Sequence, residues 1–117
     1  MKDIAIVYAT FGDRATAERV AEQMVERQLA ACANILSPSL SVYVWQGEIQ
    51  RAVEAPVLFK TGIAQREALM AALAAAHEYE LPAISSWTAQ AGAAFAQWVD
   101  EGTRAGASLG PETDRVS

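Results

Sequence analysis

The sequence predicts an α+β fold in which one antiparallel sheet is covered on one face by two helices. Patterns typical of strands and helices follow one another in the order βαββαβ, with one further helix near the C-terminal end. The right-handed rule for crossover connections brings these strands into a single sheet. A chain of 117 residues is sufficient for one such domain. The expected architecture is therefore a ferredoxin-like sandwich with a C-terminal helix.

The first strand and helix are the most clearly patterned. Residues 4–9 read "IAIVYA", an uninterrupted apolar run rich in β-branched residues, which is typical of a strand covered on both faces. Residues 12–29 change to a helical period, and Asp13 is the expected N-cap. The buried stripe of this helix is expected to consist of Ala17, Val20, Ala21, Met24 and Val25.

The middle of the chain predicts a β-hairpin. The stretch 30–49 changes to period two and is interpreted as one strand that leads into a turn. Gln46 and Gly47 mark the turn, and residues 48–61 form the return strand. Pro56 cannot donate a ladder hydrogen bond, so it predicts a bulge, a kink or an edge. The alternation places Ser41, Tyr43 and Trp45 on one face and Val42 and Val44 on the other.

The C-terminal part predicts a helix over residues 64–77, a strand that follows Pro82, and a short helix over residues 91–102. Beyond it the hydrophobic period is lost. We therefore expect a domain over residues 1–103 and a disordered tail over residues 104–117.

The predicted sheet leaves one face without helices. Large apolar groups of the two hairpin strands would lie there, and these strands are long enough to project beyond the domain as a ribbon. A third helix can cover only part of such a face. Self-association is the expected way to cover the rest.

Composition excludes several classes of partner. The net charge is −5 and the chain has only two lysines, so it lacks the basic surface of nucleic-acid binders. It also lacks an apolar run long enough to cross a membrane. The single cysteine, Cys32, favours a reducing compartment, and we expect the cytoplasm. Since no phosphate loop, CxxC pair or nucleophile motif is present, we expect no enzyme activity.

Four motifs resemble one known family. They read "QLAACAN" at 28–34, "SVYVWQGEI" at 41–49, "LFKT" at 58–61 and "HEYELP" at 77–82. In this order they resemble the CutA divalent-cation tolerance proteins over residues 4 to about 101. The resemblance implies a tight homotrimer whose sheets pack edge to edge, similar in architecture to the PII signalling proteins. It also implies a link to copper tolerance and metal binding.

Four side chains are candidate metal ligands: His77, Glu78, Glu80 and Cys32. Imidazole and carboxylate groups together form an acceptable donor set for copper(II) or another divalent cation. Simpler structural roles remain open for two of them. Cys32 has the properties of a small core residue, and His77 those of a cation favoured at the C-terminal end of a helix.

The metal site is expected to be weak. Some members of the family carry a cysteine and a second histidine where this chain has Ala9 and Ala76. One subunit therefore offers few strong ligands, and a tighter site would need ligands from more than one subunit.

Lys60 is the candidate for a site in the cleft between subunits, because the matching lysine of the family lies near that cleft. It would bind a small anionic ligand or form an ion pair with Glu48 or Glu54. The other candidates for this cleft are Tyr43, Trp45, Glu48 and Tyr79.

The sequence thus favours a non-enzymatic, cytoplasmic homotrimer of the divalent-cation tolerance type, acting as a scaffold or signalling protein. The alternative is a small-ligand sensor or an enzyme with its site in the intersubunit cleft. His77 and Glu80 would then be the acid-base groups, and Lys60 would hold an anion.

Overall fold

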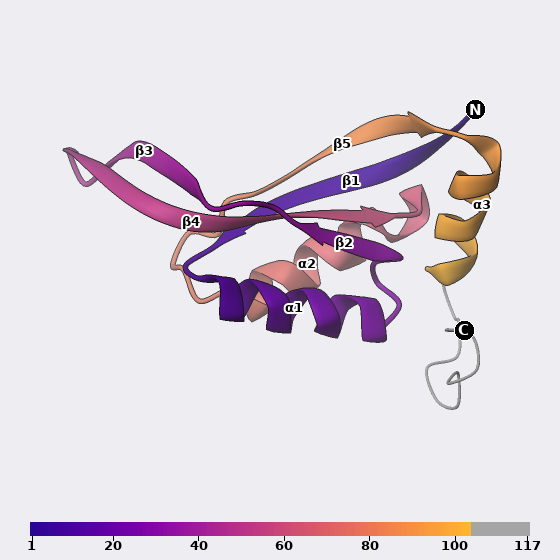
Figure 1. The fold of residues 1–117 in the computed structure, drawn as a ribbon, viewed down its shortest axis with the longest axis horizontal. Coiled ribbons are helices and arrows are strands. Elements are labelled where there is room, and N and C mark those ends of the chain that lie inside the picture. The colour runs from indigo at the N-terminus through magenta and orange to yellow at the C-terminus, as the bar shows by residue number, and fades with distance from the viewer. Residues whose placement is uncertain (104–117) are drawn as a thin grey trace.

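The structure, a computed structural model, describes residues 1–103. The disordered tail expected over 104–117 lies outside the described residues. In chain order the elements are β1 (Lys2–Phe11), α1 (Arg14–Glu26), β2 (Cys32–Ile35), β3 (Ser39–Trp45), β4 (Glu48–Thr61), the short 3-10 helix η1 (Ile63–Gln65), α2 (Arg66–Ala76), β5 (Ile84–Ala91) and α3 (Ala93–Gly102) (Figure 1).

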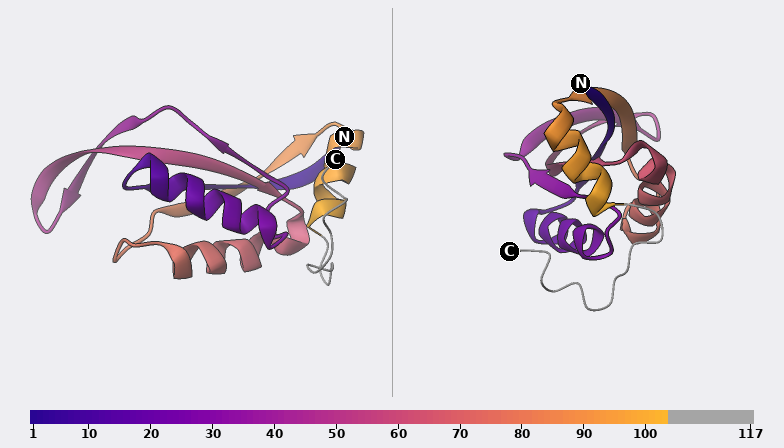
Figure 2. Two further views of the ribbon diagram at one scale, coloured as in Figure 1. Left: turned by 60° about the horizontal axis from the view of Figure 1, so that its bottom comes forward. Right: turned by 90° about the vertical axis from the view of Figure 1, so that its right-hand side faces the viewer.

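The strands form one antiparallel sheet in the order β2-β4-β1-β5, and β3 also pairs with β4. The two central strands, β1 and β4, pair from Ala5 opposite Thr61 to Phe11 opposite Ala55. Both α1 and α2 lie on the same face of this sheet (Figure 2). The α+β, ferredoxin-like architecture predicted from the sequence is confirmed.

The second predicted strand is wrong in one respect, because it consists of two strands. β2 and β3 are separated by residues 36–38, which end in Pro38. β2 pairs with residues 57–60 of β4, whereas β3 pairs with residues 48–54. Pro56 lies between these two paired stretches, so its missing N–H interrupts neither ladder, and its carbonyl accepts the Leu36 N–H at 2.9 Å.

The turn between β3 and β4 is the tight hairpin that the sequence predicts. Gln46 has a φ of 53° and Gly47 a φ of 85°. Two successive positive φ values are typical of hairpin turns whose twist matches that of the flanking strands. This turn joins β3 to the first half of β4, and the ribbon that they form extends away from the rest of the domain (Figure 1).

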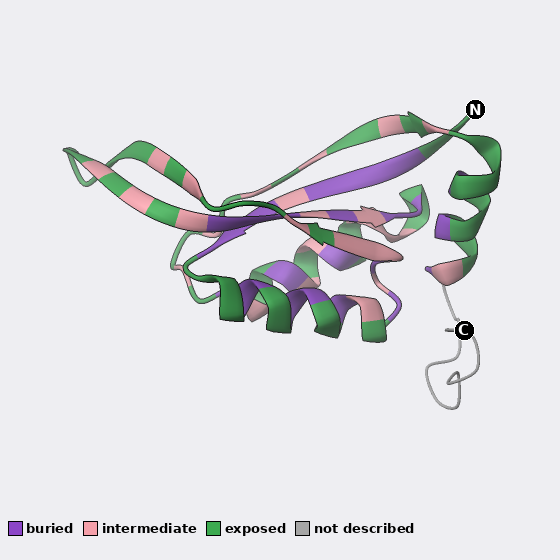
Figure 3. Cartoon of the chain, viewed as in Figure 1, coloured by how far each residue is buried: buried purple, intermediate pink, exposed green. Residues whose placement is uncertain are grey.

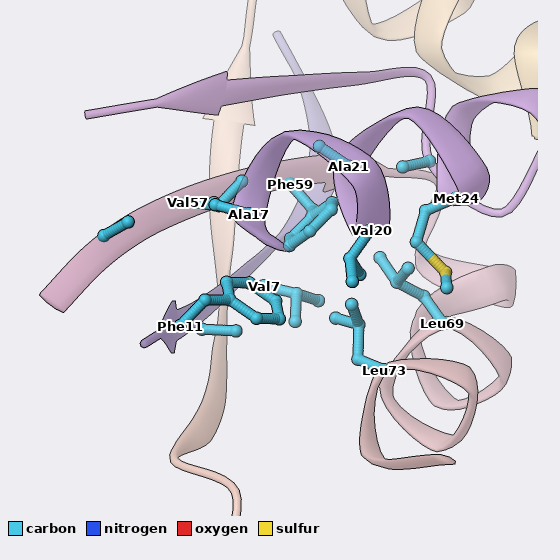
Figure 4. Packing of buried hydrophobic residues seen from close by; sticks show 13 residues of the cluster. Val7, Phe11, Ala17, Val20, Ala21, Met24, Val57, Phe59, Leu69 and Leu73 are labelled. Carbon is cyan, nitrogen blue, oxygen red and sulfur yellow. The ribbon is translucent and has the colours of Figure 1, made fainter. Parts of the chain in front are cut away.

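The main core lies between the sheet and the two helices (Figure 4). Alternate residues of β1 and β4 point toward α1 and α2, which contribute the other half of the packing. The α1 helix begins as predicted, since Asp13 accepts the Thr16 N–H at 2.7 Å. The largest fully buried core side chains are Phe11, Phe59, Met24, Leu69 and Leu73.

α3 forms a second, smaller cluster at the end of the sheet away from the ribbon (Figures 1 and 2). Ala96 and Val99 of this helix pack with Ile4 and Ile6. The cluster leaves the ribbon uncovered, and most ribbon residues are exposed (Figure 3). The described part of the chain has no helix of the length and apolar character that a membrane span requires.

Candidate functional site

A hollow of about 790 Å³ extends along the ribbon, from the end of β3 to the place where the ribbon leaves the domain. Three parts of the chain form it: β1, the β3–β4 ribbon, and the segment between α2 and β5. The described residues that line it are Tyr8, Thr10, Ser41, Val42, Tyr43, Val44, Trp45, Glu54, Tyr79, Glu80, Leu81 and Ala83. Its volume is within the range of small-molecule sites.

Glu54 is fixed by hydrogen bonds to two neutral donors of this hollow. The Ser41 hydroxyl donates to Oε1 at 2.6 Å, and the Tyr79 hydroxyl donates to Oε2 at 2.7 Å. These donors come from β3 and from the segment after α2, so the carboxylate connects two walls of the hollow. Over residues 1–103 the one ion pair is Arg14–Glu18, and Glu54 has no cationic partner there.

Tyr79 is positioned by its neighbour His77. The Tyr79 N–H donates to His77 Nδ1 at 3.1 Å, and the two ring centroids are 4.5 Å apart. Burial raises the pKa of the Tyr79 phenol, and the hydrogen bond to the Glu54 carboxylate raises it further. The phenol therefore remains a neutral donor throughout the physiological pH range.

His77 is buried, with 9% of its surface exposed. Because Nδ1 accepts the Tyr79 N–H, Nε2 carries the proton and donates to the Thr10 carbonyl at 2.6 Å. The ring also stacks on Phe11, with centroids 4.7 Å apart and an interplanar angle of 13°. Both ring nitrogens are thus engaged, and His77 can bind a metal ion only if one of these bonds breaks.

The helical position expected for His77 is wrong. α2 ends at Ala76, and His77 follows it in an extended conformation, with a φ of −78° and a ψ of 143°. Its ring therefore bonds to the end of β1 instead of the last carbonyls of α2. Extended backbone here turns the chain back toward β1 and places the next residues along the hollow.

The other candidate metal ligands lie in different places. Glu80 lines the hollow. Glu78 is exposed beside Gly12, where a Cβ would lie 2.9 Å from Glu78 Oε2. Within residues 1–103, no three His, Cys, Asp or Glu side chains are grouped so as to hold a metal ion.

Cys32 and Lys60 are neighbours, but outside the hollow. They pair directly across β2 and β4, and Lys60 Nζ donates to Asn34 Oδ1 at 2.9 Å. Lys60 Nζ also lies 5.9 Å from the centre of the Phe95 ring. Burial raises the pKa of the Cys32 thiol despite the opposing charge of Lys60. A raised pKa disfavours the thiolate that binds metals.

The ion pair expected for Lys60 is wrong within the described residues. Glu54 instead accepts hydrogen bonds from Ser41 and Tyr79, while Glu48 lies at the tip of the ribbon opposite Trp45.

One hollow does bring together four of the candidate residues, Tyr43, Trp45, Tyr79 and Glu80. Sequence reasoning missed Tyr8 and Ser41 as parts of the site and gave Glu54 the wrong role. These three residues lie on different strands, and only the pairing of the strands shows that they are neighbours.

We expect Tyr79→Phe to lower the free energy of unfolding by about 1 kcal/mol at pH 8, because it removes the hydrogen bond to Glu54. The folded state raises the phenol pKa above its usual value near 10, so this contribution is complete below pH 10 and is lost as pH rises further. The difference in melting temperature between wild type and variant should therefore shrink from pH 8 to pH 11. A constant difference would contradict the assignment.

Comparison with known proteins now decides the family. The family model described as "CutA1 divalent ion tolerance protein" matches residues 5–102, nearly the whole described chain. The chain belongs to the CutA1 divalent ion tolerance family. A CutA1 relative from Citrobacter koseri, called a divalent-cation tolerance protein, is 32% identical over 80 residues, which are 68% of this chain and 70% of the relative.

Solved structures of CutA1 proteins have the same fold. The divalent ion tolerance protein CutA1 from Ehrlichia chaffeensis is 36% identical, with a TM-score of 0.82 over 88% of this chain and 97% of its own. The protein described as a periplasmic divalent cation tolerance protein CutA, from Archaeoglobus fulgidus, is 32% identical, with a TM-score of 0.81 over 86% of this chain and 98% of its own. The family resemblance of the four motifs is thus confirmed.

Proposed function

We propose that this CutA1-family chain acts in divalent-cation tolerance as a homotrimer, in the role of a scaffold or signalling protein and without enzyme activity. Its ligand site is the hollow along the ribbon, near the boundary between subunits. The observation that carries the proposal is the apolar face of the ribbon.

Five apolar side chains share that face. Cross-strand pairing puts Leu40 opposite Val53 and Val44 opposite Ile49, with Val42 between them. Their exposed fractions range from 53% to 75%, so none is covered within the subunit. Arg51, opposite Val42, is the charged residue among them, and so many exposed large aliphatic groups are unusual on a soluble monomer and typical of a subunit interface.

The edge of β3 supports the same proposal. Within residues 1–103, β3 pairs with β4 alone, so one side of it has free backbone donors and acceptors. An exposed strand edge beside an apolar face favours pairing with another strand. A second copy of the chain supplies both the strand and a matching apolar face. The number three follows from the family resemblance, which implies sheets packed edge to edge around a threefold axis.

Copper or another divalent cation remains a proposed ligand, bound weakly. Support comes from the family and from Glu80, whose carboxylate lines the hollow. His77 would have to give up a hydrogen bond to contribute, and Cys32 lies elsewhere. The alternative, a small-ligand sensor at this site, is favoured by the fixed carboxylate of Glu54.

Sedimentation equilibrium of the purified chain tests the assembly directly. We expect three times the subunit mass at micromolar concentration, and a stable monomer would exclude the proposal.

Location in the cytoplasm is also part of the proposal, supported by the single cysteine. Because the relative from Archaeoglobus fulgidus is described as periplasmic, fractionation of cells that express the chain is the appropriate measurement.

Trp45→Ala should loosen the assembly. The indole is 38% exposed at the outer end of the ribbon, and buried aromatic side chains at interfaces often contribute about 2 kcal/mol or more. We expect a higher dissociation constant by sedimentation and a lower melting temperature. Trp98→Ala, at a half-exposed position on α3, serves as the comparison. An unchanged oligomer and melting temperature for Trp45→Ala would place this residue outside the interface.

A further inference from the structure

The hollow has the lining of a site for cations. Its described residues include three tyrosines and one tryptophan, Tyr8, Tyr43, Tyr79 and Trp45. They also include two carboxylates, Glu54 and Glu80, and no lysine, arginine or histidine. An anion would meet negative charge here without a basic partner, and Lys60 is bonded to Asn34 at the other end of β4.

Glu54 supplies a negative charge in a fixed place. Its two oxygens are held by Ser41 and Tyr79, which are neutral donors that leave the charge uncompensated. The carboxylate is partly buried, so solvent screens it less than a surface group. Since both donors hold the carboxylate in position, little reorganisation is needed when a cation enters.

The aromatic rings select the type of cation. Faces of tyrosine and tryptophan attract ammonium groups that carry apolar substituents, because such cations are weakly hydrated. A bare divalent ion instead needs several oxygen or nitrogen ligands close together, and residues 1–103 contain no such group of His, Cys, Asp and Glu. Charge and aromatic lining together therefore favour an organic cation over both a metal ion and an anion.

We propose that this hollow binds a small organic cation of the substituted ammonium type, with Glu54 as its counter-charge. The proposal rests on the proposed ligand site of the assembly and names its class of ligand. The positive group lies between Glu54 and the rings of Tyr43 and Tyr79, and the apolar part of the ligand contacts side chains such as Leu81, which is 69% exposed.

The first test compares two molecules of the same shape, choline and its uncharged isostere 3,3-dimethyl-1-butanol. Each is titrated into the wild-type chain while the indole N–H signal of Trp45 is followed by NMR. We expect a saturable shift with choline and at least tenfold weaker binding of the isostere. Inorganic phosphate should leave the signal unchanged. Equal binding of both molecules would overturn the proposal, because the hollow would then select shape and not charge.

The second test removes one negative charge. Glu54→Gln keeps the size of the side chain, and the hydroxyls of Ser41 and Tyr79 can accept or donate, so both hydrogen bonds can be retained. We expect about tenfold weaker choline binding and unchanged binding of the isostere. Glu67→Gln makes the same change at an exposed position of α2 outside the hollow, and should leave choline affinity unchanged. Equal losses in both variants would mean that only net charge matters, contrary to the proposal.

Sedimentation of the same samples separates this inference from the proposed assembly. An intact oligomer that does not bind choline would overturn the inference alone. A monomer that binds choline with the expected charge selectivity would support the inference and exclude the assembly.

Discussion

Val44→Asp is expected to dissociate the oligomer into folded monomers. Val44 is 67% exposed and lies opposite Ile49, which is 75% exposed, near the tip of the ribbon. In the assembly a carboxylate at this point would be desolvated among aliphatic side chains, at a cost of several kcal/mol. In the monomer the same carboxylate is solvated and costs little. Sedimentation equilibrium should show a single subunit mass, while circular dichroism retains the wild-type spectrum.

Ile63→Asp is the matched control for this experiment. Ile63 is also an exposed aliphatic residue, 44% exposed, but it lies in η1 and not on the ribbon. The oligomer should survive this change at the same protein concentration. If Val44→Asp remained trimeric, the apolar face of the ribbon would not be the interface.

His77→Ala is expected to lower the free energy of unfolding by about 3 kcal/mol. The change removes a buried ring that stacks on Phe11, and leaves the Thr10 carbonyl without its donor. It also frees the segment that carries Tyr79, because the Tyr79 N–H loses its acceptor. Chemical denaturation at one fixed protein concentration measures the loss, since the stability of an oligomer depends on concentration.

Glu78→Ala is the control in this case, because Glu78 is exposed and adjacent in sequence. We expect it to change the unfolding free energy by less than about 0.5 kcal/mol. A loss of stability no larger for His77→Ala than for Glu78→Ala would contradict the structural role of the histidine.

Calorimetric titration of copper(II) distinguishes this role from a metal site. Wild type is expected to bind on the micromolar scale or more weakly, about −8 kcal/mol at best. If His77 is mainly structural, the folded His77→Ala variant retains most of this weak binding, and Glu80→Ala loses it. Abolition of binding by Cys32→Ala alone would show that the ligands lie at the β2–β4 end of the sheet instead.

The fold could be predicted largely from the sequence, because each major element has a local signal. The stripe of α1 and its cap at Asp13 are contained in consecutive residues, and so is the turn at Gln46 and Gly47. The break between β2 and β3 was missed, since strand periodicity continues on both sides of Pro38. What ends one strand there is a change in the part of β4 with which the chain pairs.

The site could be predicted only in part, because it depends on strand register. Tyr43, Trp45 and Tyr79 were identified and do meet. Lys60 was placed with them although it follows Glu54 by six residues on one extended strand, a separation of about 20 Å. The hydrogen bond of His77 to the Thr10 carbonyl was also inaccessible, because Thr10 lies on a distant part of the chain.

The ribbon takes part in both proposed roles. Residues 41–45 of β3 line the hollow, and Val42 and Val44 among them also belong to the exposed apolar patch that includes Leu40. Ligand binding and subunit association therefore both involve the backbone of the same few residues. If one of these events makes that backbone more rigid, the other loses less conformational entropy when it occurs. By thermodynamic linkage, any factor by which the ligand strengthens association equals the factor by which association strengthens ligand binding. The concentration of the ligand would in this way set the fraction of subunits that are assembled.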